Sequence, residues 1–411
     1  METDAAALRH LRLAIADQNG TWRNEIQHEA IIRVINQEDV LLVVSPPGSG
    51  KTQIFMIPAM YHPSQTVVVI VPYIALGSDL AARCNQAGLQ HECWDADTVS
   101  FPNILFVTPE SACKPEFRQF LAKMDKECQL FCIVFDEVHC IFTDVGYRSA
   151  FKKLQWIGHL GTPLVLMSGT LPKVMTPKIR QGLGLDLRPF QELRAPCVNP
   201  NIQKLVQVVS HEQQLATLQQ LVNVATPRKI LLIYVLSKEK AVSLGQTLNI
   251  SSFEGNLTSE AKNSIVTKLR SGAMNAIIAT SGLGTGIDIA NVHTVVHLDG
   301  AYSMIQLVQN ATRGGRDGSH SISLTLITPG TRHRIMQSNQ DTPLAEYVSG
   351  KKCLNAIISE YLDSAETQCT DNQPLCSVCS ELSSPHIPLS SPPPPLPPPP
   401  SKSSSPYTTN L

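Results

Sequence analysis

VLLVVSPPGSGKT, at residues 40–52, joins a run of apolar residues to a loop of small residues that ends in Lys51 and Thr52. Such an apolar run is typical of a buried parallel strand, and small residues let the loop curl so that its N–H groups face a phosphate. Lys51 can reach the β- and γ-phosphates, and the Thr52 hydroxyl can hold Mg²⁺. A helix after the loop adds its positive end to the site. We therefore expect a nucleotide site here, although a chance Gly/Ser turn reads the same in isolation; the expected loop residues are Pro47, Gly48, Ser49 and Gly50.

Short apolar runs alternate with longer polar-periodic stretches from residue 40 to residue 330. The pattern predicts helices such as 74–87 and 212–224, and strands at 40–44, 67–71, 104–107, 131–135, 164–167, 230–235, 276–279, 294–298 and 322–327. Strand–helix alternation of this kind is typical of α/β layers. A break at 187–203 contains three prolines and is typical of a linker, so we expect two α/β domains rather than one sheet.

The pattern changes after residue 330. Residues 331–363 have the spacing of helices, and residues 383–411 are rich in Ser and Pro, which predicts an extended or disordered tail. The proline run at 392–400 is a flexible segment or a ligand for a proline-binding adaptor domain. The expected domains are 1–198, 199–330 and 331–382, followed by the tail at 383–411.

Two acidic residues, Asp136 and Glu137, follow the expected strand at 131–135. The carboxyl end of a buried strand is where α/β folds bind ligands. Asp136 can complete the Mg²⁺ shell, and Glu137 can orient or deprotonate an attacking water. His139 can link this site to the second domain, or it can be a packed core histidine. The hydroxyls of Ser168 and Thr170 can hydrogen-bond the acid pair, although Ser-Gly-Thr is also an ordinary turn.

The second half of the chain offers two further phosphate-binding patterns. Residues 280–288 carry three glycines at alternate positions and suit close approach to a phosphate chain. Arg313 and Arg316 are three residues apart, so they share one face if a helix is present. Arginine forks match phosphate oxygens, and we expect this pair to face the phosphate loop of the first domain as arginine fingers. A solvated basic turn is the alternative.

Cysteines gather after the second domain, where Cys376 and Cys379 have the spacing of a metal knuckle. Four thiolates suit a tetrahedral structural Zn²⁺. The expected zinc ligands are Cys353, Cys369, Cys376 and Cys379, with four unligated thiols as the alternative.

The composition limits the partners. The formal net charge is −1, so a nucleic acid must be held in a local groove rather than by bulk charge. No apolar stretch approaches the ~20 residues of a membrane span, and the N-terminus lacks the features of a signal peptide. We expect a soluble intracellular protein with no membrane partner, whose eleven cysteines are reduced or metal-bound.

The motifs, in this order, resemble those of superfamily 2 helicases and, within them, the RecQ family of DNA helicases. The resemblance extends over about residues 20–381. Residues 22–27 resemble the adenine-recognition motif, 71–76 and 108–110 the strand-contacting motifs, and 136–139 the acid box. Residues 280–288 and 309–316 resemble the last two motifs, and the cysteines resemble the family's zinc-binding subdomain.

The resemblance implies two tandem RecA-like parallel-sheet domains followed by a small helical zinc-binding subdomain, as in a short form of the family. It implies ATP with Mg²⁺ and structural Zn²⁺ as cofactors, and DNA, as single strand and duplex junction, as the partner. The implied activity is that of a helicase that moves 3′ to 5′ along DNA. The implied role is in repair or recombination, in the nucleus. The implied catalytic residues are Lys51, Asp136, Glu137, Arg313 and Arg316. The implied nucleotide-binding residues add Arg23, Gln27, Gly286, Asp288 and Gln309 to the loop.

Two alternatives remain open. An RNA helicase of the same superfamily meets the same phosphate backbone, so the core motifs do not separate it from a DNA helicase. A weakened nucleotide-binding scaffold is suggested by the short chain, the proline-rich tail and an aromatic loop reduced to Phe142, Tyr147, Arg148 and Phe151.

Overall fold

The computed structural model describes residues 2–72, 75–143, 145–280, 289–316, 318–338, 340–370 and 372–383. Outside these described residues lie Gly286, Asp288 and residues 384–411, the last of which include the proline run predicted as an adaptor ligand. The side chains of Tyr147 and Arg148 also lie outside them. Among the described residues, no helix has the length and apolar character needed to cross a membrane.

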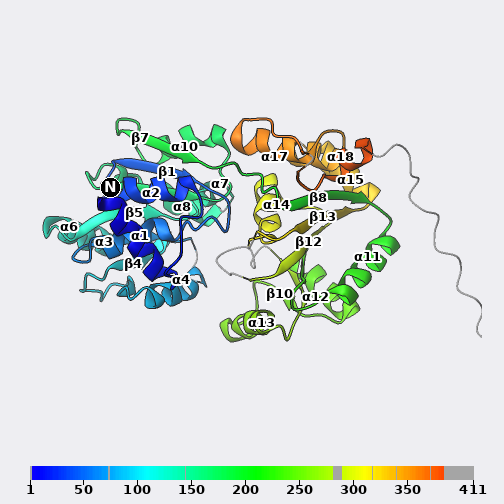
Figure 1. The fold of residues 1–411 in the computed structure, drawn as a ribbon, viewed down its shortest axis with the longest axis horizontal. Coiled ribbons are helices and arrows are strands. Elements are labelled where there is room, and N and C mark those ends of the chain that lie inside the picture. Colours follow the sequence, from blue (N-terminus) through cyan, green and yellow to red (C-terminus); the bar gives the residue numbers. More distant parts are fainter. Residues whose placement is uncertain are drawn as a thin grey trace, which may run out of the picture.

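The first lobe is built on a parallel sheet in the order β3-β4-β2-β5-β6-β1-β7 (Figure 1). Its strands are β1 (Val40–Val44), β2 (Thr66–Ile70), β3 (His91–Cys93), β4 (Ile104–Val107), β5 (Leu130–Phe135), β6 (Leu164–Ser168) and β7 (Phe190–Arg194). Its helices are α1 (Glu2–Ala14), α2 (Glu25–Ile35), α3 (Gln53–Tyr61), α4 (Ala75–Gln86), α5 (Pro109–Ala112), α6 (Pro115–Lys126), α7 (Cys140–Thr143), α8 (Val145–Lys153), α9 (Gln155–Gly158) and α10 (Thr176–Gly182), with a 3₁₀ turn, η1 (Lys173–Met175).

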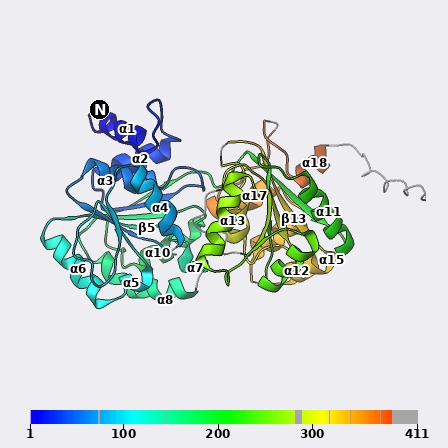
Figure 2. The same cartoon turned by 90° about the horizontal axis from the view of Figure 1, so that it is seen from below.

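The apolar run of β1 is buried on both faces of this sheet. Leu42 and Val44 belong to one apolar cluster, whereas Leu41 and Val43 belong to another. Successive side chains of a strand point to opposite faces, so a run without polar residues is needed wherever helices cover both faces. Helices α1, α2 and α3 pack together over one of these faces (Figure 2).

The second lobe is a parallel sheet in the order β10-β11-β9-β12-β13-β8. Its strands are β8 (Ile202–Val208), β9 (Ile230–Tyr234), β10 (Ser252–Phe253), β11 (Ala276–Ala279), β12 (Val292–Leu298) and β13 (Ser321–Ile327), and its helices are α11 (His211–Val224), α12 (Lys238–Leu248), α13 (Ser259–Ser271) and α14 (Met304–Ala311). The two-domain α/β architecture expected from the sequence is therefore confirmed.

The connection between the lobes is shorter than the predicted linker at 187–203. Phe190–Arg194 forms β7, which pairs with β1, and Ile202–Val208 forms β8, which pairs with β13. Both strands lie at the edge of their sheets, where most of their residues are only partly buried or exposed, and they lack the apolar run of a central strand. Residues 195–201 are all that remains between the two sheets, and we call them the linker.

A small helical part follows the second sheet. It consists of α15 (Pro329–Gln337), α16 (Thr342–Ser349), α17 (Leu354–Asp363) and α18 (Ser377–Ser383). Figure 1 shows these helices, in orange to red, beside the second lobe, with α17 on the side of α10 and the first lobe. Ile357, Ile358 and Leu362 of α17 are buried in the apolar cluster that also contains Leu42 and Val44 of β1. A continuous apolar core therefore joins the first lobe to the helical part.

Candidate nucleotide cleft and cysteine cluster

The phosphate loop begins where β1 ends and leads into α3, as its sequence predicts. Gly48 and Gly50 both have φ of +83°, a left-handed conformation that glycine adopts without strain. The Lys51 ammonium donates hydrogen bonds to the carbonyl oxygens of Ser45 at 2.9 Å and Pro46 at 3.3 Å. Burial lowers the pKa of Lys51, while Glu137 and Asp136 oppose that shift. The ammonium therefore lies between the loop and the acid pair.

Gln27 and Arg23 support the loop from the first turn of α2, which the Asn24 side chain caps. The Gln27 amide donates to the Gly50 carbonyl at 3.2 Å and accepts a hydrogen bond from the Arg23 backbone N–H at 2.8 Å. The Arg23 guanidinium donates to the Gly48 carbonyl at 2.8 Å. Gln27 is only 3% exposed, so this frame holds the loop from behind while the Arg23 side chain lines the cleft.

The acid pair stands directly after β5. The backbone N–H of Asp136 bonds the Ile70 carbonyl of β2 at 2.9 Å, which continues the sheet by one residue. Glu137 has φ of +49°, a strained conformation for a residue with a side chain and one that clusters at functional sites. Burial and the neighbouring Glu137 raise the pKa of Asp136, whereas His139 and Lys51 hold that of Glu137 low against its own burial. The turn thus places two unlike carboxyls beside Lys51.

His139 joins the acid pair to the second lobe. Its Nδ1 lies 3.2 Å from a Glu137 carboxylate oxygen and 3.0 Å from the Ser168 hydroxyl, and its Nε2 contacts the side-chain amide of Gln309 on α14. A carboxylate can only accept, so Nδ1 carries the proton in its contact with Glu137. Burial lowers the pKa of His139, but Cys140 and Glu137 outweigh it and raise that pKa. The linking role considered for His139 therefore has a geometric basis.

The Ser-Gly-Thr turn reaches the acid pair by a different route from the one expected. The Ser168 hydroxyl contacts His139 and accepts a hydrogen bond from the Thr170 backbone N–H at 3.2 Å. The backbone N–H of Gly169 bonds Glu137. In the described contacts, the Ser168 hydroxyl is therefore connected to Glu137 through His139, which contacts both.

The arginine pair lies beyond the end of α14, in turns rather than on the helical face considered from the sequence. Arg313 is only 4% exposed. The stem of Arg316 crosses to the first lobe, because a Cβ added to Gly48 would lie 3.6 Å from its Cβ and Cγ atoms. Arg316 thus lies against the phosphate loop and Arg313 lines the same cleft, without a shared helix.

These groups line one cleft of about 1030 Å³ between the lobes. The cleft brings together predicted site residues from both halves of the chain: Arg23, Gln27, Pro47, Gly48, Gly50, Lys51, Thr52, Asp136, Glu137, Gln309, Arg313 and Arg316. Ser49 lies in the loop but is not among the lining residues. Figure 2 shows α13 on the side of the second lobe that faces the first.

Several lining residues were not found from the sequence. Leu11 and Ile15 come from α1 and the residues after it, and Arg228 and Arg270 come from the second lobe. They belong to no recognised motif and reach the cleft through tertiary packing of segments far apart in the sequence.

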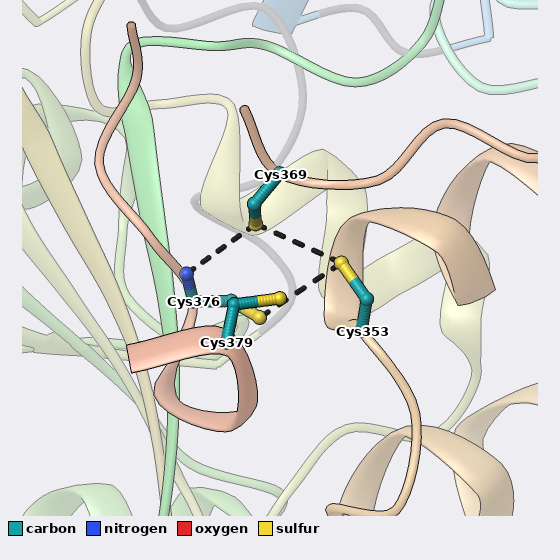
Figure 3. Close-up of side chains that lie close together, drawn as sticks. All are labelled: Cys353, Cys369, Cys376 and Cys379. Atoms are coloured by element: carbon teal, nitrogen blue, oxygen red, sulfur yellow. Dashed lines mark hydrogen bonds between the residues drawn. The ribbon is translucent and has the colours of Figure 1, made fainter. Parts of the chain in front are cut away.

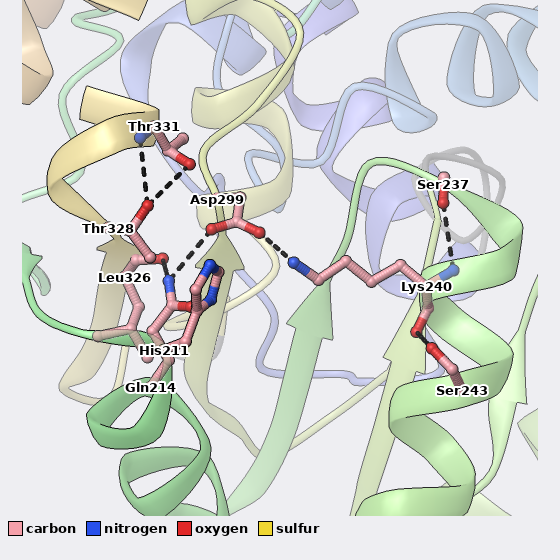
Figure 4. Close-up of polar contacts among 9 residues, drawn as sticks. All are labelled: His211, Gln214, Ser237, Lys240, Ser243, Asp299, Leu326, Thr328 and Thr331. Carbon is pink, nitrogen blue, oxygen red and sulfur yellow. Dashed lines mark hydrogen bonds and ion pairs between the residues drawn. The ribbon is translucent and has the colours of Figure 1, made fainter. Parts of the chain in front are cut away.

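A second cavity, of about 370 Å³, lies at the carboxyl ends of β9, β12 and β13. Asp299 accepts hydrogen bonds from the Lys240 ammonium and from the Gln214 amide, the latter at 3.1 Å (Figure 4). Gln214 also donates to the Leu326 carbonyl at 3.1 Å. This network ties together the loops at one edge of the second sheet.

The four predicted zinc ligands form one cluster (Figure 3). Their sulfur atoms all lie within 4.8 Å of one another, and that of Cys353 is 3.7 Å from Cys369 and 4.0 Å from Cys376. Zinc–sulfur bonds of about 2.3 Å in a tetrahedron separate the sulfurs by about 3.8 Å. Backbone N–H groups of Leu354 and Cys376 donate to two of these sulfurs, at 3.5 Å and 3.4 Å. The donor set fits a zinc ion.

A buried lysine lies next to this cluster. Lys204 of β8 is 4% exposed, and its ammonium donates to the Asn199 carbonyl at 2.8 Å. Burial lowers the pKa of Lys204 to about 8, while the charges of Cys369, Cys376 and Cys353 act in the opposite direction. Neither the motifs nor the spacing indicated this residue.

Two family models match the chain. The model described as DEAD/DEAH box helicase matches residues 24–176, and the model described as helicase conserved C-terminal domain matches residues 213–318. The first match includes the phosphate loop and the acid pair, and the second includes the arginine pair.

Two relatives of different description are similar over most of the chain. The chain is 24% identical to a putative ATP-dependent RNA helicase of Acanthamoeba polyphaga mimivirus, over 82% of this chain and 66% of that protein. It is 23% identical to the ATP-dependent DNA helicase RecQ of Bacillus subtilis, over 88% of this chain and 65% of that protein. The chain therefore spans about two thirds of the length of these relatives.

The fold is also similar to a solved structure. Dbp5 of S. cerevisiae, bound to RNA and ADP BeF3, superposes with a TM-score of 0.65 over 92% of this chain and 95% of that one, at 16% sequence identity. At that identity the likeness concerns the fold alone. It supports two RecA-like parallel-sheet domains.

Proposed function

We propose that this chain, a superfamily 2 helicase of the RecQ-like kind, hydrolyses ATP and uses closure of its two lobes to move along a DNA strand. The observation that carries the proposal is the single cleft that brings the phosphate loop, the acid pair and the arginine pair together. Phosphoryl transfer needs little covalent chemistry from a protein and depends on positioning and charge. Each of those requirements has a group in the cleft.

The loop amides and Lys51 would hold the β- and γ-phosphates, with Gln27 and Arg23 toward the adenine. Thr52 and Asp136 would hold Mg²⁺, which neutralises charge on the phosphate oxygens. Glu137 would orient the attacking water, while His139 fixes its carboxylate through the Nδ1 contact at 3.2 Å. Arg313 and Arg316 would stabilise the charge that develops on the transferred phosphoryl group.

The contact between His139 and Gln309 suggests how hydrolysis is coupled to movement. Gln309 belongs to the second lobe, and His139 contacts the water-orienting Glu137 of the first. Opening of the lobes would break the contact and leave Glu137 less well oriented. Hydrolysis would then depend on closure, as in enzymes whose lids complete the site.

DNA is the proposed strand because the cysteine cluster after the second lobe matches the RecQ pattern. We propose that Cys353, Cys369, Cys376 and Cys379 hold structural zinc, which joins the segments that carry them. The 3′ to 5′ direction, the role in repair or recombination and a nuclear location belong to the same proposal and follow from the resemblance. The RNA-helicase description of one relative keeps RNA as the second candidate strand.

The test combines ATP hydrolysis with unwinding of a fluorescent DNA fork. We expect wild-type protein with Mg²⁺-ATP to unwind the fork and to hydrolyse ATP faster with single-stranded DNA, and Lys51→Ala to lose both activities. Lys173→Ala removes an exposed lysine of the same lobe and is the matched control. Stronger stimulation by a matched RNA strand would favour the RNA helicase. ATP binding without stimulated hydrolysis would favour a scaffold.

A further inference from the structure

The linker, residues 195–201, is held toward the first lobe by the part of the chain that carries the cysteine cluster and toward the second lobe by Lys204 of β8, a strand bonded to that part. We call residues 353–370 and 372–383 the cysteine unit. We propose that the zinc-loaded cysteine unit clamps the linker, with Asp363 holding its first-lobe end and Lys204 its second-lobe end, and so defines the hinge about which the lobes close. This inference rests on the proposed closure, but its tests need neither nucleotide nor nucleic acid.

Asp363, the last residue of α17, holds the first-lobe end. Its carboxylate accepts a hydrogen bond from the Cys197 backbone N–H at 2.8 Å and lies 3.8 Å from the Arg194 guanidinium. Arg194 also donates to the Leu362 carbonyl at 3.2 Å and to the Leu171 carbonyl at 2.7 Å. A cation is favourable at the carboxyl end of a helix, where carbonyl groups lack helical partners. The end of α17 is therefore joined to β7 and to the linker.

Lys204 holds the second-lobe end. Its ammonium donates to the Asn199 carbonyl at 2.8 Å, inside the linker. Residues on either side of it fasten β8 to the cysteine unit. Gln203 donates to the Leu375 carbonyl at 2.9 Å, and the Val206 backbone N–H donates to the Ser377 hydroxyl at 3.2 Å. The Cys376–Cys379 knuckle is thus attached to the first strand of the second lobe.

The metal would join these two ends through α17. Cys353 immediately precedes the helix and Asp363 ends it, so the cluster lies at one end of α17 and the linker contact at the other. A helix rises about 1.5 Å per residue, which makes α17 a strut of about 15 Å. Zinc bonded to all four sulfurs would fix the start of α17 to the knuckle on β8. Its far end would then hold Cys197 in a defined place.

The charge of the cluster gives Lys204 a second task. Zinc with four thiolates carries a net charge of −2, and a buried net charge is costly unless it is paired. Lys204 is buried on the strand whose neighbouring residues bond Leu375 and Ser377 beside the knuckle, so its ammonium would supply part of the counter-charge, in the manner of the outer groups that tune metal sites. Lys204 is therefore a positioning residue that serves both the metal and the linker.

Amide hydrogen exchange at Cys197 tests the clamp directly, because this N–H donates to Asp363. We expect exchange at Cys197 to become about tenfold faster when a chelator removes zinc and to recover when zinc is restored, which corresponds to a loss of about 1.4 kcal/mol in local protection. Amides of β1 serve as the internal reference. Unchanged exchange at Cys197 in zinc-free protein with intact β1 protection would overturn the proposal.

Two variants separate the clamp from the metal. Asp363→Ala removes the acceptor and should speed exchange at Cys197 while leaving zinc retention unchanged. Lys204→Met should release zinc to a chelator about tenfold faster, since outer groups of metal sites have effects of this size. Lys204→Arg should restore most of the retention, and Lys229→Met, at an exposed lysine of the same lobe, is the control. Equal zinc release from Lys204→Met and wild type would remove the counter-charge role, and unchanged Cys197 exchange in Asp363→Ala would remove the clamp.

Discussion

Gly50 is the residue of the phosphate loop where backbone and neighbour both require glycine. Its φ of +83° lies in the left-handed region, and an added Cβ would lie 2.1 Å from the Gln27 amide nitrogen. That nitrogen donates to the Gly50 carbonyl, so displacing Gln27 also breaks the frame behind the loop. Gln27 and the phosphate loop are therefore coupled through one small residue.

We predict that Gly50→Ala lowers stability by about 1–3 kcal/mol, the usual cost of a strained backbone conformation. We also expect the affinity for a fluorescent ATP analogue to fall about tenfold or more, because the loop amides lose their alignment. Gly161→Ala is the matched control, since a Cβ there meets nothing within 4 Å and its φ is not positive. Equal effects of the two substitutions on nucleotide affinity would contradict the prediction.

The residues of the cleft were predictable only where their role is local. Lys51 and Asp136 follow apolar runs, and this order alone indicates a ligand at the carboxyl end of a strand. The packing of Arg316 on Gly48 and the contact of Gln309 with His139 join residues far apart in sequence. Such contacts depend on how two lobes dock, which no short-range pattern records.

Strand β12 contains a histidine, His297, inside the buried core of the second sheet. His297 is fully buried, stacks on Tyr234 of β9 at 6.1 Å between ring centroids, and has the Ser323 hydroxyl 3.3 Å from its Nε2. Burial lowers the pKa of His297 to about 3. The imidazole is therefore neutral in the folded sheet over the whole physiological range.

This histidine should make the second lobe sensitive to acid. A group whose pKa is lower in the folded state contributes stability that is present above its unfolded pKa, about 6.5, and is lost as the pH falls toward 3. We expect a loss of about 2 kcal/mol from this group at pH 5. Urea unfolding of wild type and His297→Phe at pH 7.5 and pH 5 measures it, with the exposed His333→Gln as control. The wild type and His297→Phe should differ in their pH dependence; identical dependence would show that His297 does not contribute.

A comparison of central and edge strands shows which strands can be predicted from the sequence. The central strands, such as β1 and β5, are buried on both faces and appear as uninterrupted apolar runs. The edge strands β7 and β8 contain charged and polar residues because one side of each faces solvent or the linker. β3 and β10 are too short for any pattern to stand out. The error in the predicted linker therefore follows from reading half-exposed edge strands as a break.

At the scale of the whole molecule, the described residues join the first lobe to the rest of the chain through two contacts with different chemistry. The helical part joins the first lobe through an apolar core and the Asp363–Arg194 pair, which suits a lasting contact. The cleft joins the two lobes through polar side chains such as Gln309 and Arg316, which suits a contact that opens and closes. We expect movement at the cleft and a fixed pivot at the helical part.

Substitution of Arg316 is the most direct test of movement at the cleft, because its aliphatic stem and its guanidinium would make different contacts. The stem packs on Gly48 across the cleft, while the guanidinium would meet charge on the transferred phosphoryl group only when the lobes are closed. Arg316→Met retains the stem, so nucleotide affinity should stay within about threefold, whereas single-turnover hydrolysis should fall about a hundredfold or more, as for other lost transition-state donors. Arg316→Ala removes both and should weaken binding as well. Arg334→Met, at an exposed arginine outside the cleft, should leave both quantities unchanged. If Arg316→Met hydrolysed ATP at the wild-type rate, the second lobe would be a passive wall of the cleft, and closure could not be the step that couples ATP to movement.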